Sequence, residues 1–171
     1  KADQMNVMLV AAKKVMINDY TKVLADAGLT PVILDIDVFA LENAFEINYP
    51  MDEDQNAALI DVGASTININ VIKGGLSAFT RDVFLGGNQI TEDIQKQFGI
   101  SFDEAETLKT SGDVNRDDFG GKEIVKQVCD NIASEIQKSL DFYSSTTYES
   151  VNKIYLSGGC AKIPFMKDII E

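Results

Sequence analysis

The chain has 171 residues and a formal net charge of −12, from 15 basic and 27 acidic side chains, and it contains no histidine. Binding to a phosphate backbone or to an anionic bilayer depends on clustered Lys and Arg, so this charge argues against a nucleic-acid-binding protein and against direct membrane docking. The lack of histidine excludes Ser-His-Asp triads and His-ligated metals. Hydrophobic residues at 45% and charged residues at 25% are ordinary values for a globular protein.

The cysteine usage and the lengths of the apolar stretches predict a protein of a reducing compartment. Cys129 and Cys160 lie far apart and lack the spacing of a metal site. Cys160 has no neighbouring base that would activate it, so we interpret it as a packing residue. No apolar stretch is long enough for a membrane-spanning helix or a signal peptide. Because the chain begins at Lys1 and ends at Glu171 within a helical pattern, we expect a fragment of a longer protein.

The first 47 residues have the pattern of a small α/β lobe. The apolar run 6–12 predicts a buried strand, and apolar residues at helical spacing predict a helix over 13–27. Residues 32–36 predict a second strand. Asp37 is then suited to cap a helix over 38–47. The predicted order is βαβα, in which the first helix crosses between parallel strands.

A meander of three antiparallel strands follows a polar break. Residues 48–56 hold one proline and three acids, which predicts a solvated turn. The continuous apolar run 57–62 predicts a strand covered on both faces. Residues 66–72 alternate between apolar and polar side chains, with Thr66, Asn68 and Asn70 on one face. A Gly-Gly pair at 74–75 predicts a hairpin turn into a partner strand over 76–84.

Helices dominate the remainder of the chain. A helix over 88–98 begins after Gly86-Gly87, and Ser101 and Glu104 have capping-box spacing at the start of a helix that runs to Lys109. The pattern then predicts a surface loop at 110–121, a long helix at 122–143, a strand at 153–157 and a terminal helix from about 165.

The Asp61-x-Gly63 triplet is the first candidate binding motif. It lies where a buried strand turns back, and a glycine there allows backbone N–H groups to approach a phosphate closely. A carboxylate two residues earlier can hold a Mg²⁺-bound water, and Ser65 and Thr66 add hydroxyl groups. A purely structural turn remains an alternative, because Asp-x-Gly turns are common.

Two Gly-Gly pairs and one helical pair are the other candidates. Gly158-Gly159 and Gly86-Gly87 each lie between a strand and a helix, where a nucleoside can lie against bare backbone and a helix start offers N–H groups. A plain entry turn is the alternative for both. Glu106 and Lys109 share one helix face. They are either a surface ion pair or a pair that reaches a ribose hydroxyl and a purine edge.

Taken in order, these motifs resemble the second half of the actin, sugar-kinase and heat-shock-chaperone superfamily, which has a ribonuclease H-like fold. Within it the chain resembles the PilM family of type IV pilus assembly proteins over nearly its whole length. The stretches that carry this resemblance are 8–14, 34–45, 79–92 and 139–143, of which Phe-Thr-Arg-Asp and Gly-Gly-Asn-Gln within 79–92 are the most specific.

The resemblance implies an actin-like α/β nucleotide-binding lobe over 57–171, preceded by the remnant of a small α/β subdomain and a linking helix over 1–47. It implies a cytoplasmic ATP-binding scaffold of the pilus inner-membrane complex. Such a scaffold docks the cytoplasmic tail of PilN and associates with other inner-membrane pilus components. It is peripheral at the inner membrane through these partners, without inserting into it.

The resemblance also implies roles for individual residues. Asp61 would lie by Mg²⁺ through a water, and no residue is expected to act as a catalytic group. The residues expected to contact ATP are Gly63, Ala64, Ser65 and Thr66 at the β- and γ-phosphates, Gly86 and Gly87 at the following helix start, Glu106 and Lys109 at the ribose and base, and Gly158, Gly159 and Ala161 at the adenosine.

One departure from the family pattern concerns the phosphate clamp. These proteins carry another Asp-x-Gly hairpin near the N-terminus, whereas the other triplets in this sequence, Asp26-Ala-Gly28 and Asp118-Phe-Gly120, fall at a predicted helix end and in a loop. We therefore expect these 171 residues to bind ATP weakly or not at all and not to hydrolyse it. A weak ATPase activity of the full-length protein stays open.

Three other interpretations remain open from the sequence. The chain is also compatible with FtsA, an actin-like cell-division protein, and with a small-molecule kinase of the same superfamily. The kinase would need a catalytic Asp outside this sequence. The third interpretation is a degenerate fold that binds only protein partners.

Overall fold

The computed structural model describes residues 7, 9–50, 55–115 and 120–171, with the side chain of residue 115 outside the description. The chain forms two units, Lys1–Asp35 and Ile36–Glu171. The first contains α1 (Lys14–Asp26), which matches the predicted helix over 13–27 and buries none of its residues. Of the turn predicted at 48–56, residues 51–54 with all three acids lie outside the described residues, and its two end residues belong to the neighbouring helix and strand.

The two strands predicted in the first unit are wrong where the structure describes them. Residues 7, 9–12 and 32–36 have no strand assignment, and residues 6 and 8 lie outside the description. Both segments are apolar, but a strand also needs a neighbour whose backbone completes its hydrogen bonds. In the part of the chain that is described, the sheet is made by other segments. The predicted βαβα lobe is therefore reduced to its helices.

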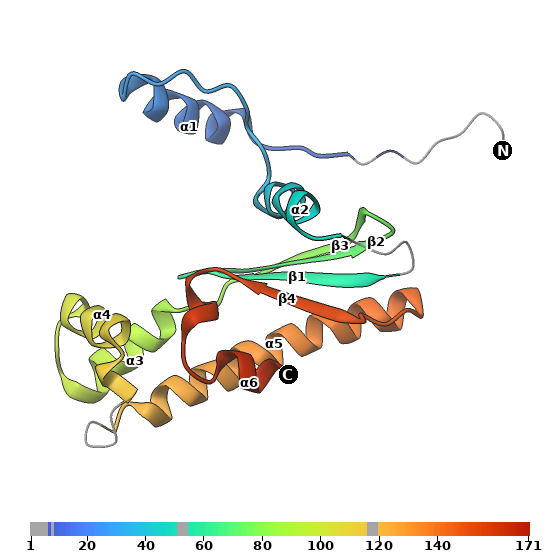
Figure 1. Cartoon of the computed structure of the whole chain (residues 1–171). Coiled ribbons are helices and arrows are strands. Elements are labelled where there is room, and N and C mark those ends of the chain that lie inside the picture. The colour runs from blue at the N-terminus through green and yellow to red at the C-terminus, as the bar shows by residue number, and fades with distance from the viewer. Residues whose placement is uncertain (1–6, 8, 51–54, 116–119) are drawn as a thin grey trace, which may run out of the picture. The chain divides into compact units, whose positions relative to one another are not determined.

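The second unit is built on one mixed four-stranded sheet (Figure 1). Its strands are β1 (Asn56–Val62), β2 (Ile67–Lys73), β3 (Leu76–Val83) and β4 (Lys153–Ser157), in the order β3-β2-β1-β4. The pairs β1–β2 and β2–β3 are antiparallel, which confirms the predicted meander, and β4 pairs parallel with β1. A register shift between Val71 and Ile72 marks a bulge in the β2–β3 pair.

Helices cover both faces of this sheet. α2 (Asp37–Asn48) lies on one face and α5 (Lys122–Thr147) on the other (Figure 1). α3 (Asn88–Phe98) and α4 (Phe102–Ser111) lie side by side beyond one end of the strands. The short α6 (Met166–Ile170) packs on α5. Two 3₁₀ turns complete the unit, η1 (Asp113–Asn115) and η2 (Gly159–Lys162).

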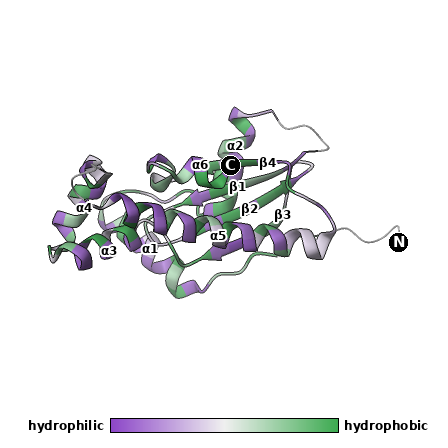
Figure 2. Ribbon diagram, turned by 90° about the horizontal axis from the view of Figure 1, so that it is seen from below, coloured by the Kyte–Doolittle hydropathy of each residue, from purple (hydrophilic) through white to green (hydrophobic). Residues whose placement is uncertain are grey.

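The core lies between the sheet and α5. Every second residue of the strands points toward the helix, and α5 presents one apolar stripe to them. Figure 2 shows β1 and β2 largely in the hydrophobic colour. The fully buried contributors include Ile60, Ile69, Ile90, Ile132 and Tyr143. A smaller cluster on the opposite face packs Phe45 of α2 against Leu59 and Ile72.

A buried polar chain also fixes α2 on the sheet. Asn70 of β2 has no exposed surface, and its side-chain amide donates to the Glu42 carboxylate at 2.9 Å. Ser77 donates to the Asn70 side-chain oxygen at 2.7 Å. Burial raises the pKa of Glu42, and the neighbouring Glu46 adds to this, while the hydrogen bond from Asn70 opposes it. These hydrogen bonds thus join α2 to the strands in addition to the apolar contact of Phe45, and unlike that contact they are directional.

Of the other predictions for helices, caps and loops, some are confirmed and some are wrong. The helix over 88–98 is confirmed, and the capping box forms, with both the Ser101 and Glu104 bonds present. Asp37 is not the cap of α2, because the helix already includes it and Ile36 occupies the N-cap position. The predicted surface loop at 110–121 contains the buried Val114, which packs in the core through η1.

Candidate functional site

Asp61 lies near the end of β1, where the parallel strand β4 also ends. It pairs in register with Ser157, whose hydroxyl donates to Asp61 Oδ1 at 2.9 Å. The side chain of Asp61 is only half-buried. A carboxylate held by one hydroxyl and still reached by solvent retains oxygen lone pairs for further donors, such as waters around a cation.

A polar row crosses the sheet at the level of Asp61. Residues paired directly opposite each other share one face, and the register aligns Ser157, Asp61, Asn68 and Asp82 across all four strands. Asn68 donates to Asp82 at 2.9 Å. Sequence reasoning placed Asn68 on a polar face but assigned it no role, and it missed Ser157 and Asp82. Only the strand register reveals that these residues adjoin Asp61.

The turn after β1 presents backbone N–H groups at the surface. The Gly63 N–H donates to the Thr66 carbonyl at 3.0 Å, which closes the turn. Ala64 and Ser65, at its tip, are exposed. Within the described residues, no acceptor bonds the N–H groups of residues 64–66. Successive free N–H groups in a turn form a concavity suited to an anion.

The start of α3 packs against this turn and donates hydrogen bonds to two of its carbonyl groups. The Gly87 N–H donates to the Gly63 carbonyl at 3.0 Å, and the Asn88 N–H donates to the Ala64 carbonyl at 2.8 Å. A Cβ at Gly86 would lie 2.5 Å from the Gly63 oxygen, so only glycine permits this approach. The Asn88 side chain adds a bond to the Ser65 hydroxyl at 3.0 Å.

The turn after β4 packs against the same hairpin. Gly158 has a φ of +87°, and a Cβ there would lie 2.9 Å from Asp61 Oδ1 and closer still to the Val62 carbonyl. Gly159 is exposed, and a Cβ on this residue would have nothing within 4 Å. Ala161 lies in η2 and is half-buried. The two glycines thus differ, because Gly158 is required by packing and Gly159 leaves open space.

Glu106 and Lys109 lie on α4 and face the start of α3. The Lys109 ammonium is 2.6 Å from Glu106 Oε2, and Thr91 donates to the same oxygen at 2.6 Å. Burial acts to raise the pKa of Glu106, but the hydrogen bonds from Lys109 and Thr91 outweigh it and hold that pKa below its usual value. The Lys109 side chain is only 11% exposed, whereas that of Glu106 is 38% exposed. Glu106 therefore keeps a solvent-facing surface.

The two cysteines are buried and free. The Cys160 thiol donates to the Gly63 carbonyl at 3.2 Å, so it packs against the hairpin turn from the β4 side. Burial raises the pKa of Cys160, and it raises the pKa of Cys129 to about 11. Neither thiol is activated as a nucleophile, which agrees with a packing role.

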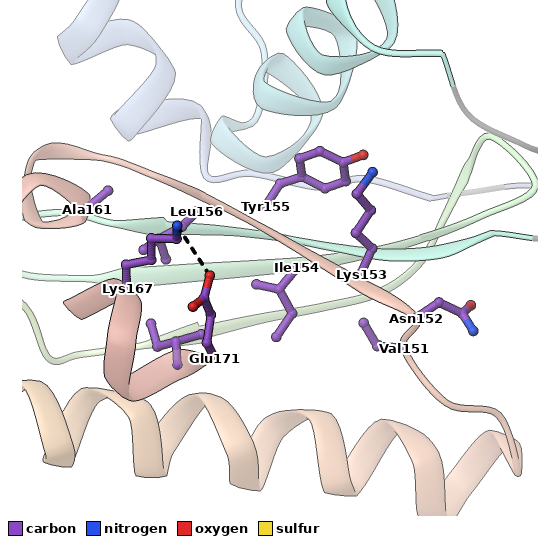
Figure 3. Close-up of a pocket in the computed structure, with 10 residues that line it drawn as sticks. Val151, Asn152, Lys153, Ile154, Tyr155, Leu156, Ala161, Lys167 and Glu171 are labelled. Atoms are coloured by element: carbon purple, nitrogen blue, oxygen red, sulfur yellow. Dashed lines mark ion pairs between the residues drawn. The ribbon is translucent and has the colours of Figure 1, made fainter. Parts of the chain in front are cut away.

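A hollow of the unit lies elsewhere, along the outer edge of β4. It has a volume of about 620 Å³ and is lined by residues 151–156 together with Ala161 and the side of α6. Figure 3 shows Lys167 of α6 and Glu171, the residue that follows this helix, forming an ion pair at this hollow. Of the predicted site residues only Ala161 borders it. We therefore place the candidate site at the hairpin turn, where the bare N–H groups and the carboxylate are.

Two further structural findings concern metals and membranes. In the portion of the chain that the structure covers, no three His, Cys, Asp or Glu side chains gather into a metal site. No helix among the described residues has the length and apolarity needed to cross a bilayer.

The second unit has an actin-like fold. The chain aligns with MreB5 of Spiroplasma citri bound to ADP at a TM-score of 0.65 and 19% identity, over 92% of this chain and 57% of that one. A model of the type IV pilus assembly protein PilM matches residues 1–171, and the chain belongs to this family. The structure of a PilM-PilN type IV pilus biogenesis complex matches at a TM-score of 0.82 and 24% identity, over 93% of this chain.

The sequence similarity extends to an ethanolamine utilization protein. The ethanolamine utilization protein EutJ of Escherichia coli K12 is 24% identical over 149 residues, which is 80% of this chain. The chain spans 49% of the length of EutJ and 45% of the chain in the PilM-PilN complex. It therefore corresponds to about half of each of these relatives.

Proposed function

We propose that the protein is an ATP-binding, actin-like scaffold of the type IV pilus inner-membrane assembly complex and that it docks the cytoplasmic tail of PilN. It acts on the cytoplasmic side and is peripheral at the inner membrane through PilN and other pilus components. The observation that supports the nucleotide part is the hairpin turn beside the Asp61 carboxylate, where the N–H groups of residues 64–66 have no backbone acceptor among the described residues and Ala64 and Ser65 are exposed.

The residues present fit a magnesium nucleotide. The N–H groups of residues 64–66 and the hydroxyls of Ser65 and Thr66 would bind the phosphates, and Asp61 would hold a Mg²⁺-bound water. Mg²⁺ would supply neutralisation of the phosphate charge. Glu106 is exposed enough to accept a bond from a ribose hydroxyl. We propose that the nucleoside lies closest to five residues: Gly86, Gly87, Gly158, Gly159 and Ala161.

Calorimetry with Mg-ATP on the natural full-length protein tests this site. We expect Asp61→Ala to weaken binding by about tenfold or more, because it removes a charged partner of the hydrated metal. Asp141→Asn is the matched control, since Asp141 lies on α5 and accepts a bond from Gln137 at the surface. Equal affinities for the wild type and Asp61→Ala would refute the nucleotide role of the hairpin.

α1 offers a surface for the docking part of the proposal. Five apolar side chains form a stripe on this helix and remain 40–71% exposed: Val15, Met16, Tyr20, Val23 and Leu24. An exposed stripe of this kind suits a partner peptide with its own apolar side chains. We propose that it contributes to PilN docking.

A fluorescence binding assay with a peptide of the PilN cytoplasmic tail tests the docking surface. We expect Val23→Asp to weaken binding at least about tenfold, since it buries a charge in an apolar contact. Asn18→Asp introduces the same charge on α1 outside the apolar stripe and should leave binding unchanged. If the protein captures only cell-division partners, the pilus role is contradicted and the FtsA interpretation is favoured.

A further inference from the structure

The Lys109 ammonium is enclosed by three acceptors. It lies 2.6 Å from Glu106 Oε2, 2.8 Å from Thr91 Oγ1 and 3.2 Å from the Gly87 carbonyl oxygen. An ammonium group has three N–H donors, so these acceptors can take all of them. With a side chain that is only 11% exposed, Lys109 points into the α3–α4 contact.

One of those acceptors belongs to the residue that holds the hairpin turn. Gly87 receives the Lys109 bond on its carbonyl, and its own N–H donates to the Gly63 carbonyl at 3.0 Å. The next N–H, that of Asn88, donates to the Ala64 carbonyl at 2.8 Å. Two bonds therefore run directly from the first turn of α3 to the turn that carries the candidate phosphate-binding N–H groups.

The glycine geometry shows how closely these parts fit. A Cβ at Gly87 would lie 2.6 Å from Cys160 Sγ and 3.7 Å from Lys109 Nζ. The segment is thus confined by Cys160 on one side and Lys109 on another. Rigid placement of N–H groups is what makes an anion site effective, because no reorganisation is then needed on binding.

We propose that Lys109 is a positioning residue for the phosphates of the bound nucleotide, acting through the Gly87 carbonyl, and not a residue that touches the base. Thr91 and Glu106 hold the ammonium in place for this role. The inference rests on the proposed nucleotide function. It differs from the role that the family resemblance implies for Lys109, and the two roles predict different ligand dependences.

The affinities for three ligands distinguish a role of Lys109 at the phosphates from a role at the ribose or base. In the natural full-length protein, calorimetry with ATP, ADP and adenosine compares the wild type with Lys109→Met. We expect the affinities for ATP and ADP to fall about tenfold, the effect of one charge-assisted hydrogen bond, while that for adenosine changes less than about twofold. Lys96→Met is the control, because the side chain of Lys96 on α3 is 71% exposed and its ammonium lies 3.6 Å from Asp93.

A second variant covers the case in which Lys109→Met does not fold. Thr91→Val keeps the side-chain shape but removes the hydroxyl that accepts from Lys109 and donates to Glu106. It should show the same selective loss for phosphorylated ligands, to a smaller degree. Equal losses for ATP and adenosine would place Lys109 at the base or ribose and overturn the inference, as would unchanged ATP affinity.

Hydrogen exchange gives a readout that needs no ligand. We expect the N–H groups of Gly87 and Asn88 to exchange at least about tenfold faster in Lys109→Met than in Lys96→Met, because their segment loses its anchor. If the wild type binds no nucleotide, the proposed function fails and the phosphate-positioning role falls with it, and exchange then tests only whether Lys109 anchors the segment at Gly87 and Asn88. Unchanged exchange at these two positions would overturn it.

Discussion

α1 and α5 are both amphipathic helices, yet the apolar face of α5 is buried and that of α1 is exposed. α5 buries eight residues against the sheet, whereas α1 buries none. The difference arises from what lies opposite each stripe, because α5 faces the inner side chains of strands that are paired with one another. The comparison teaches that helical spacing predicts a helix but does not predict what will cover its apolar face.

The largest expected change in the free energy of unfolding comes from a residue of α5 in the core. Ile132 of α5 is fully buried, and Ile132→Ala should lower the free energy of unfolding by about 2–5 kcal/mol. Val15 of α1 is 71% exposed, so Val15→Ala should change it by less than about 0.5 kcal/mol. Urea unfolding followed by circular dichroism measures both. Similar costs for the two variants would break the contrast between the helices.

The next prediction compares glycines. Gly158→Ala should cost about 2–4 kcal/mol, because its positive φ and its contact with the Val62 carbonyl leave no room for a Cβ. Gly28 in the first unit also has a positive φ, +79°, but nothing lies within 4 Å of a Cβ there. Gly28→Ala should therefore cost about 1 kcal/mol of local strain.

Gly159→Ala is the matched control within the second unit. Its Cβ position is open, so the free energy of unfolding, measured by thermal denaturation, should change by less than about 0.5 kcal/mol. If Gly158→Ala is as well tolerated as Gly159→Ala, the tight packing of the β4 turn on the hairpin is contradicted.

Helix capping gives a smaller contrast. Ser101→Ala should destabilise the second unit by about 1 kcal/mol, since it removes the side-chain half of the capping box of α4. Lys13, at the N-cap of α1, makes no side-chain capping bond, and Lys13→Ala should have no measurable effect. Denaturant unfolding at neutral pH checks both, and a neutral Ser101→Ala would show that the cap contributes nothing.

The smallest effect concerns the buried carboxyl under α2. Because burial raises the pKa of Glu42 in the folded state, its ionised form is disfavoured there, and stability should rise as pH falls through that raised pKa toward 4.5. Glu42→Gln keeps an acceptor for Asn70 without the charge. It should be slightly more stable than the wild type at pH 7, and this gain should vanish near pH 4.5.

An exposed carboxyl in α1 provides the comparison for the buried carboxyl under α2. Asp19→Asn removes an exposed carboxyl and should change the free energy of unfolding at neutral pH by less than about 0.5 kcal/mol, measured by thermal denaturation. A Glu42→Gln variant that is less stable than the wild type at neutral pH would mean that the ionised carboxylate is favoured under α2. That result would contradict a raised pKa for Glu42.

Much of the second unit could be predicted from sequence because its signals are local. The strand β2, the Gly-Gly turn and the capping box are each specified within a few residues, and all three form, although α2 also covers Asn70 on the face of β2 that was predicted to be polar. The predicted strands at 6–12 and 32–36 failed where the structure describes them. Apolar content indicates a tendency toward burial, whereas a strand also depends on a neighbour that the segment itself does not specify.

The candidate site divides in the same way. The sequence by itself determined the position of the Asp61 turn and of the glycines that follow β3 and β4, because turn chemistry is local. Only the tertiary structure decided that Asn68, Asp82 and Ser157 share a row with Asp61, and that Lys109 is enclosed beside Gly87. Strand register and helix packing set these contacts, and both arise from pairing segments that lie far apart in the chain.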